Sequence, residues 1–291
     1  MSLKFTIPPE HWSTPSSGDS IRKPHRLAAA IGDVIAVGST ENIIDFYNAE
    51  SGALIDTYWG LDSFSKQLLA LPDNRLAIVS HLYVKIIDVE KPRRPASFLG
   101  ADYVGFRGHD WIINCMALLP TGQIASGGGP PDIIIWDVPT QKATHKYFAG
   151  GICTSMCTLP DGRLVSGHDD GFVNIWDIRE AKRTQLIDCK DKEPIKSLCV
   201  LPDGRVAAAV GNQKTVLWDI DTQTSTVMPD REGIEVLATI DGRLITGTES
   251  GQVNILGGPT IDAHKGRVCS ISPIPGGFIT GGEREVKVWT Y

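Results

Sequence analysis

The stretch from Ile135 to Ile220 repeats one pattern three times. Each copy closes a short apolar run with a Trp-Asp pair, at 136–137, 176–177 and 218–219. The pairs are spaced by 40 and 42 residues, and a Leu-Pro turn precedes each of them: LPTG at 119–122, LPDGR at 159–163 and LPDGR at 201–205. A period of this length predicts a repeat architecture, in which each unit buries its apolar face against its neighbours.

Inside each unit, β-branched and aromatic residues alternate with Gly, Asp and Pro turns. In the second copy, for example, RLVSG at 163–167 is followed after a polar turn by FVNIWD at 172–177. Such runs predict short antiparallel strands. The sequence has no long segment with the 3.6-residue apolar period of an amphipathic helix, so we expect an all-β chain.

Weaker copies extend the pattern over almost the whole chain. Aligned on the third strand of each unit, the positions equivalent to the tryptophans are 46, 87, 136, 176, 218, 256 and 289. The seventh unit ends at Tyr291, without room for a fourth strand. The segment LKFTI at 3–7 alternates apolar and polar residues, and we predict that it pairs with 286–291 and closes the ring. Six units with an irregular N-terminal segment remain an alternative.

These features resemble the WD40-repeat family. The resemblance rests on the three Trp-Asp pairs, on Gly108-His109, on the Ser-Gly steps at 126–127 and 166–167, and on the Leu-Pro-Asp-Gly turns. It implies a β-propeller, here with seven four-stranded blades, the N-terminal strand completing the last. We expect one domain over residues 1–291, with about 1–10 as the closing segment and 22–291 as the repeats.

The family often holds each blade with a hydrogen-bonded His, Ser or Thr, Asp and Trp, and this chain keeps the set in fragments. In unit four, Gly150-Gly151 stands where the His is expected, and in unit three Pro130-Pro131 displaces the acid to Asp132. In unit seven, Glu283 lies near the position of the acid. The resemblance assigns structural roles to His109, Ser126, Trp136, Ser166, Asp170, Trp176, Trp218, His264, Thr280 and Trp289.

Composition limits the classes of function. The net charge of −6 and the pI near 5.6 disfavour nonspecific nucleic-acid binding, which needs a basic surface. No apolar run is long enough to span a membrane, and residues 1–10 do not read as a signal peptide. The six cysteines lie mostly in apolar runs, as expected for buried thiols in a reducing compartment. We therefore expect a cytoplasmic protein, with the nucleus left open.

The sequence shows none of the constellations that common reactions need. It has no phosphate-binding loop, no His-Glu-x-x-His motif and no Gly-x-Gly-x-x-Gly before a helical pattern. Gly127-Gly128-Gly129 is followed by two prolines and predicts a turn between strands. We expect no catalytic, cofactor-binding or metal-binding residues, and hence no enzyme. A propeller enzyme or small-molecule binder that uses the central channel is the alternative.

Binding in repeat proteins concentrates on loops that a rigid scaffold presents. Trp111 is the strongest candidate, because it precedes a first strand and fills no structural position of the repeat, and exposed Trp and Arg are typical of interaction hot spots. The candidates for partner binding are Trp111, Ile112, Arg267, Arg231, Arg22, Phe64, Glu193 and Trp59. We predict a non-enzymatic scaffold or adaptor, a monomeric propeller within a complex, that binds a protein or peptide on one face. A structural subunit of a larger assembly is the second alternative.

Overall fold

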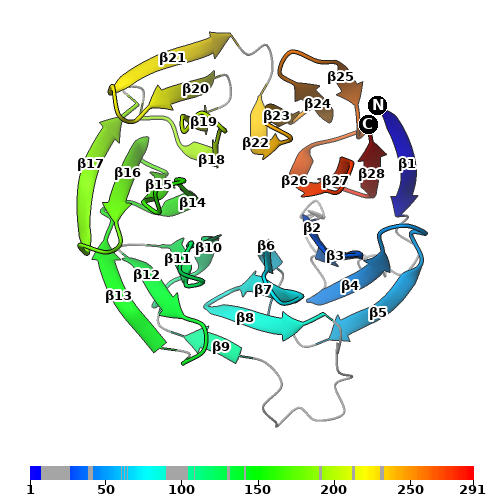
Figure 1. Ribbon diagram of the computed structural model, residues 1–291, viewed down its shortest axis with the longest axis horizontal. Helices are drawn as coiled ribbons and strands as arrows, with labels where there is room; N and C mark the ends of the chain where they lie inside the picture. The colour runs from blue at the N-terminus through cyan, green and yellow to red at the C-terminus, as the bar shows by residue number, and fades with distance from the viewer. Residues whose placement is uncertain are drawn as a thin grey trace, which may run out of the picture.

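Twenty-eight short strands form seven antiparallel sheets, which stand as blades around a central axis (Figure 1). The structure is a computed structural model that describes residues 1–7, 27–38, 42–59, 61, 63, 65–89, 104–107, 109–129, 132–140, 142–189, 192–211, 214–229 and 233–291. Within these residues there is no helix. The prediction of an all-β propeller with seven four-stranded blades is confirmed, and the six-blade alternative is wrong.

Each blade contributes an inner strand, two middle strands and an outer strand, in chain order in the first six blades. The strands are β2 (Leu27–Ile31), β3 (Val34–Gly38), β4 (Ile43–Asn48) and β5 (Leu54–Trp59) in blade 1; β6 (Ser65–Leu71), β7 (Arg75–Ser80), β8 (Tyr83–Asp88) and β9 (Val104–Arg107) in blade 2; β10 (Ile113–Leu118), β11 (Ile124–Gly128), β12 (Asp132–Asp137) and β13 (Lys142–Phe148) in blade 3; β14 (Cys153–Thr158), β15 (Leu164–His168), β16 (Phe172–Asp177) and β17 (Lys182–Asp188) in blade 4; β18 (Ile195–Val200), β19 (Val206–Val210), β20 (Lys214–Asp219) and β21 (Thr224–Pro229) in blade 5; β22 (Ile234–Ile240), β23 (Arg243–Thr248), β24 (Gln252–Ile255) and β25 (Thr260–Asp262) in blade 6; and β26 (Val268–Ile274), β27 (Gly277–Gly282), β28 (Val286–Thr290) and β1 (Ser2–Ile7) in blade 7.

The N-terminal strand closes the ring. β1 runs antiparallel to β28 as the outer strand of blade 7, so the two chain termini lie side by side (Figure 1). Ile7 is fully buried in an apolar cluster with Val286 and Val288 of blade 7 and with Val37 of blade 1. The first strand therefore covers the edge that β28 would otherwise expose.

The core is divided into seven apolar clusters, each shared by two neighbouring blades. The tryptophans of the Trp-Asp pairs lie in these interfaces. Trp176 of blade 4, for example, packs on Tyr147 of blade 3, with ring centroids 5.3 Å apart. The repeat period thus follows from packing, because every blade must present the same apolar face to the blade before it.

Inner strands are also joined from blade to blade by side chains at one repeated position, three residues into the strand. Ser155 Oγ accepts a hydrogen bond from the backbone N–H of Leu198, and Ser197 Oγ accepts one from that of Leu237. Ser270 Oγ accepts from Ala28 N and so ties blade 7 to blade 1. These bonds satisfy backbone donors that no strand partner reaches, and they fix the inner ends of the blades.

Candidate interaction face

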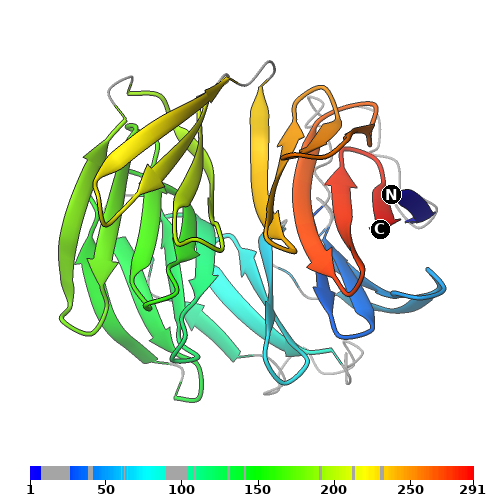
Figure 2. The same cartoon turned by 45° about the horizontal axis from the view of Figure 1, so that its top comes forward.

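The propeller has two rims of loops, one at the top and one at the bottom of the view in Figure 2. We call the rim at the start of the inner strands the upper rim; it also holds the turns between the two middle strands of each blade, such as 168–172. The opposite, lower rim holds the turns that follow the inner strands, such as 158–164, and those between the third and fourth strands. Every described partner-binding candidate lies on the upper rim.

Trp111 lies on the upper rim of blade 3, two residues before β10. Its side chain is 61% exposed, although the residue itself is held in place. A Cβ atom at Gly129 would lie 2.5 Å from Trp111 Cβ, so only glycine lets the tryptophan lie across the end of β11. The backbone N–H of Gly129 donates to the carbonyl oxygen of Ile112 at 3.1 Å. Glycine is therefore needed at position 129 because the side chain of any other residue would collide with Trp111.

Other apolar side chains are exposed on the same rim. Ile112 is 40% exposed, and Phe148, at the end of the outer strand of blade 3, is 72% exposed. Phe148 pairs with Asp132 across β12 and β13, which places it at the upper end of the blade. Trp59 is 57% exposed at the upper end of β5 in blade 1. The sequence patterns gave no reason to select Phe148, because an outer strand end has no fixed residue type in the repeat.

The charged candidates have different environments. Arg267, directly before β26, forms ion pairs with Glu235 of blade 6 at 3.3 Å and with Glu249 at 3.3 Å. Glu193 is exposed before β18, and a side chain at Gly211 would collide with it. Arg22, Phe64 and Arg231 lie outside the described residues. Arg267 is thus already engaged by carboxylates of its own chain.

A ring of bulged residues surrounds the upper mouth of the channel. Within the residues that the structure describes, the pairing of the inner strand skips its second residue in six blades: Lys66, Asn114, Thr154, Lys196, Glu235 and Cys269. Bulges of this kind turn a side chain out of the regular alternation. Lys66 Nζ donates to Asn114 Oδ1 at 2.6 Å, and Asn114 Nδ2 donates to the carbonyl oxygen of Cys153 at 3.1 Å. Burial lowers the pKa of Lys66 below its ordinary value.

The polar contacts continue around the mouth into blades 4 to 7. Thr154 Oγ1 donates to the carbonyl oxygen of Ile195, and Lys196 pairs with Glu235, which pairs with Arg267. Each contact joins one blade to the next. The bulged side chains therefore hold the inner ends of the blades together, a role that spacing in the sequence did not reveal.

Blades 3 and 7 contain the expected hydrogen-bonded chain of tryptophan, hydroxyl and histidine. Trp136 Nε1 donates to Ser126 Oγ at 2.7 Å, and His109 Nε2 lies 2.7 Å from the same oxygen. In blade 7, Trp289 Nε1 donates to Thr280 Oγ1 at 2.9 Å, and His264 Nε2 lies 2.8 Å from it. The carboxylate nearest His264 is that of Glu285, 3.4 Å from Nδ1, rather than that of Glu283.

Blade 4 forms the same series of hydrogen bonds, but its histidine comes from a different position in the sequence. Trp176 Nε1 donates to Ser166 Oγ at 2.9 Å, and this hydroxyl lies 2.9 Å from Nε2 of His168, at the end of β15. His168 Nδ1 faces the carbonyl oxygen of Gly151 at 3.4 Å, so the hydrogen is on Nδ1 and Nε2 accepts. Asn174 Nδ2 also donates to Nε2, at 2.9 Å. Burial lowers the pKa of His168, which keeps the ring neutral.

The two remaining structural candidates, Asp170 and Trp218, make fewer side-chain contacts. Asp170 Oδ1 accepts from the backbone N–H of Phe172 at 3.3 Å, beside the blade 4 chain. Trp218 is buried in blade 5, where Ala208 occupies the register position of Ser126 and Ser166. Blade 5 thus keeps the packing of the tryptophan without the hydroxyl beneath it.

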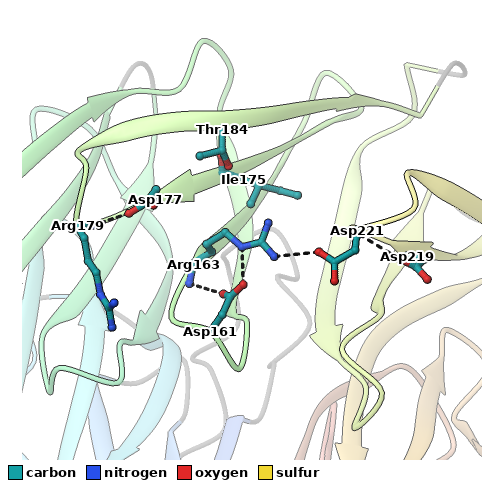
Figure 3. Close-up of polar contacts among 8 residues, drawn as sticks. All are labelled: Asp161, Arg163, Ile175, Asp177, Arg179, Thr184, Asp219 and Asp221. Atoms are coloured by element: carbon teal, nitrogen blue, oxygen red, sulfur yellow. Dashed lines mark hydrogen bonds and ion pairs between the residues drawn. The ribbon is translucent and has the colours of Figure 1, made fainter.

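On the lower rim of blades 4 and 5, polar side chains hold the turns by contacts within the chain (Figure 3). Asp177 Oδ1 accepts from the backbone N–H groups of Arg179 and Glu180, so the Asp of the Trp-Asp pair caps the turn that follows it. Arg163 Nε donates to Asp161 Oδ2 at 2.6 Å, and Arg163 also reaches Asp221 of blade 5 at 3.5 Å. The Leu-Pro-Asp-Gly-Arg turns therefore use their acid and base within the scaffold.

No group of three His, Cys, Asp or Glu side chains within the described ranges is arranged to hold a metal ion. The part of the chain that the structure describes also contains no helix of the length and hydropathy needed to cross a membrane.

Comparison with known proteins agrees with this geometry. The family described as WD domain, G-beta repeat (WD40) matches residues 102–137 and 141–177. These matches end at Trp136-Asp137 and Trp176-Asp177. They run from β9 of blade 2 to β16 of blade 4 and include the tryptophan and serine of blades 3 and 4 that form the hydrogen bonds described above. A search among curated proteins gave no match. WD40 propellers generally mediate protein–protein interactions. The chain thus carries WD40 repeats within a seven-bladed β-propeller.

Proposed function

We propose that this chain is a non-enzymatic interaction module that binds a protein or peptide through its upper rim. The observation that carries the proposal is Trp111. The indole is 61% exposed, yet a glycine at position 129 is required to seat it. None of the blade hydrogen bonds uses it, and tryptophan is one of the three residue types enriched in interaction hot spots.

The scaffold is suited to present a binding surface on the loops of the upper rim. Blades 2 to 7 are joined at their inner ends by side-chain contacts, so the loops of the upper rim stand on a rigid base. A rigid base reduces the conformational entropy that the loops lose on binding. The adaptor role follows from this: the chain supplies a surface, and any reaction belongs to a partner.

The test is affinity purification from extracts of the source cells, with the wild-type chain, Trp111→Ala and Val227→Ala. Val227 is a matched control, because it is 58% exposed in the middle of the outer strand β21, outside the loops of the upper rim. We expect Trp111→Ala to lose partners that Val227→Ala keeps. Identical partner lists for all three proteins would contradict the proposal. Size-exclusion chromatography of the captured complex separates a transient adaptor from a permanent structural subunit.

The six cysteines are free, and they favour a reducing, cytoplasmic compartment. Imaging of a fluorescent-protein fusion tests this part of the proposal, and a signal confined to secretory compartments would contradict it.

A further inference from the structure

The upper-rim loops of blades 3 and 4 that precede the end of β17 have charge of one sign, and the described part of the loop after β17 adds one charge of each sign with Lys192, beside Gly171, and Glu193. Residues 109–112, 128–129, 132, 148–152 and 168–172 contain four aspartates and no lysine or arginine. Their two histidines, His109 and His168, are buried, and the lowered pKa of His168 keeps that ring neutral. This sector therefore has a negative charge that its own loops do not balance.

The described aspartates of this sector are held in place without cationic partners. Asp169 Oδ1 accepts from the backbone N–H of Ile152 at 2.9 Å, and Asp170 Oδ1 accepts from that of Phe172. Asp110 is exposed next to Trp111. Within the described residues, no lysine or arginine forms an ion pair with any of the three.

Blades 5 to 7 contrast with this sector on the same rim. Lys196, Glu235, Arg267 and Glu249 form a continuous series of ion pairs, so the charges there balance each other. Glu235 is largely buried in this series. The unbalanced charge and the exposed tryptophan thus coincide on blades 3 and 4.

We propose that the upper rim of blades 3 and 4 binds a cationic peptide segment of a partner protein, with an arginine or lysine of that segment over the indole of Trp111. The proposal rests on the interaction function proposed above and names the chemistry of the partner. An indole face is the aromatic surface that attracts cations most strongly. The aspartates steer a basic segment to the rim and repel an acidic one. Ile112 and Phe148 supply apolar contact for the neighbouring side chains of the peptide.

The experiment is selection from a phage-displayed library of random peptides on the full chain, followed by affinity measurements with the selected peptides made synthetically. The variants are Trp111→Ala and the triple change Asp110→Asn, Asp169→Asn and Asp170→Asn. Asparagine keeps the Oδ1 acceptor that the backbone N–H groups of Ile152 and Phe172 use, so the loops stay folded. Asp221→Asn is the matched control, because this aspartate is 88% exposed on the lower rim.

We expect the selected peptides to be enriched in arginine and lysine. Trp111→Ala should weaken their binding at least about tenfold, as for a hot-spot residue. The triple variant should weaken it about fivefold at low salt, and less at high salt because the charges are screened. Asp221→Asn should leave the affinity within about twofold, since it lies outside the interface.

Acidic or uncharged selected peptides, or cationic peptides whose affinity neither rim variant changes, would overturn this inference. Peptides that bind another surface would leave the interaction function standing and reject only the cationic partner. A library that yields no peptide overturns the inference as well, and the affinity purification with Trp111→Ala then decides the interaction function independently.

Discussion

Replacement of Ser166 by alanine tests whether the hydrogen-bonded chain of blade 4 stabilises the propeller. The Ser166 hydroxyl accepts from Trp176 Nε1 and lies 2.9 Å from His168 Nε2, and all three side chains are buried. The variant leaves the indole N–H without an acceptor. His168 Nε2 retains the donor on Asn174. The variant therefore loses two hydrogen bonds and leaves one buried donor, the indole N–H, without a partner.

A buried donor without a partner costs about 1–3 kcal/mol, so we expect Ser166→Ala to lower the free energy of unfolding by about 2 kcal/mol. For a chain of this size, that corresponds to a fall of about 4 °C in Tm. The assay is thermal unfolding followed by circular dichroism at pH 7.5 in the presence of a reductant.

Ser225→Ala is the control, because the same atoms are removed from an exposed position on β21, where the effect should stay within about 0.5 kcal/mol. If Ser166→Ala and Ser225→Ala melt at the same temperature as the wild type, the hydrogen-bonded chain does not stabilise blade 4. The reasoning about His168 as the substitute histidine would then be wrong.

Three further predictions concern closure, pH and thiol reactivity. Ile7→Ala should destabilise the chain by about 3 kcal/mol because Ile7 is fully buried between blades 7 and 1, whereas the exposed Leu3→Ala should change Tm little; equal melting curves would contradict ring closure by β1. The pKa of His264 is lowered from 6.5 to about 4, chiefly by burial, so the unfolded chain binds a proton there at a pH where the folded chain does not. The free energy of unfolding is therefore unaffected by this group above pH 6.5, and it falls by about 1.4 kcal/mol per pH unit as the pH drops toward 4. Denaturant titrations at several pH values should show that the unfolding free energy of His264→Gln depends less on pH than that of the wild type. Equal pH dependence of the two proteins would contradict this. Cys153 is buried and its thiol pKa is raised, so mass spectrometry after brief treatment with iodoacetamide should find Cys153 unmodified in the folded chain and modified in urea; rapid labelling of the folded chain would contradict the packing.

The repeat in the sequence predicts the fold well because packing imposes it. Trp136, Trp176, Trp218 and Trp289 lie in the interfaces between blades, and the turns that precede them recur for the same reason. Even the degenerate blades keep alternating apolar strands, so their third strands could be placed. Closure by residues 3–7 was predictable because blade 7 has no other fourth strand.

The site was less predictable because its geometry depends on contacts between blades. The role of His168 requires a histidine at the end of β15 to reach back to Ser166, which a motif based on chain order does not describe. The ring of bulged residues depends on a skipped position in the strand register. The sequence does not predict such a bulge, because the bulged positions share no residue type. Arg267 could be placed on the upper rim from the sequence, but its pairing with Glu235 and Glu249 could not.

The most direct test of the central claim is photo-cross-linking from defined positions. A benzophenone amino acid is introduced in place of Ile112 on the upper rim or in place of Val227 on the outer strand of blade 5, and both proteins are irradiated in extracts of the source cells. The account predicts a discrete cross-linked partner from position 112, absent from position 227 and lost when Trp111→Ala is added. Cross-links of equal yield from both positions, or from position 227 alone, would contradict binding through the upper rim.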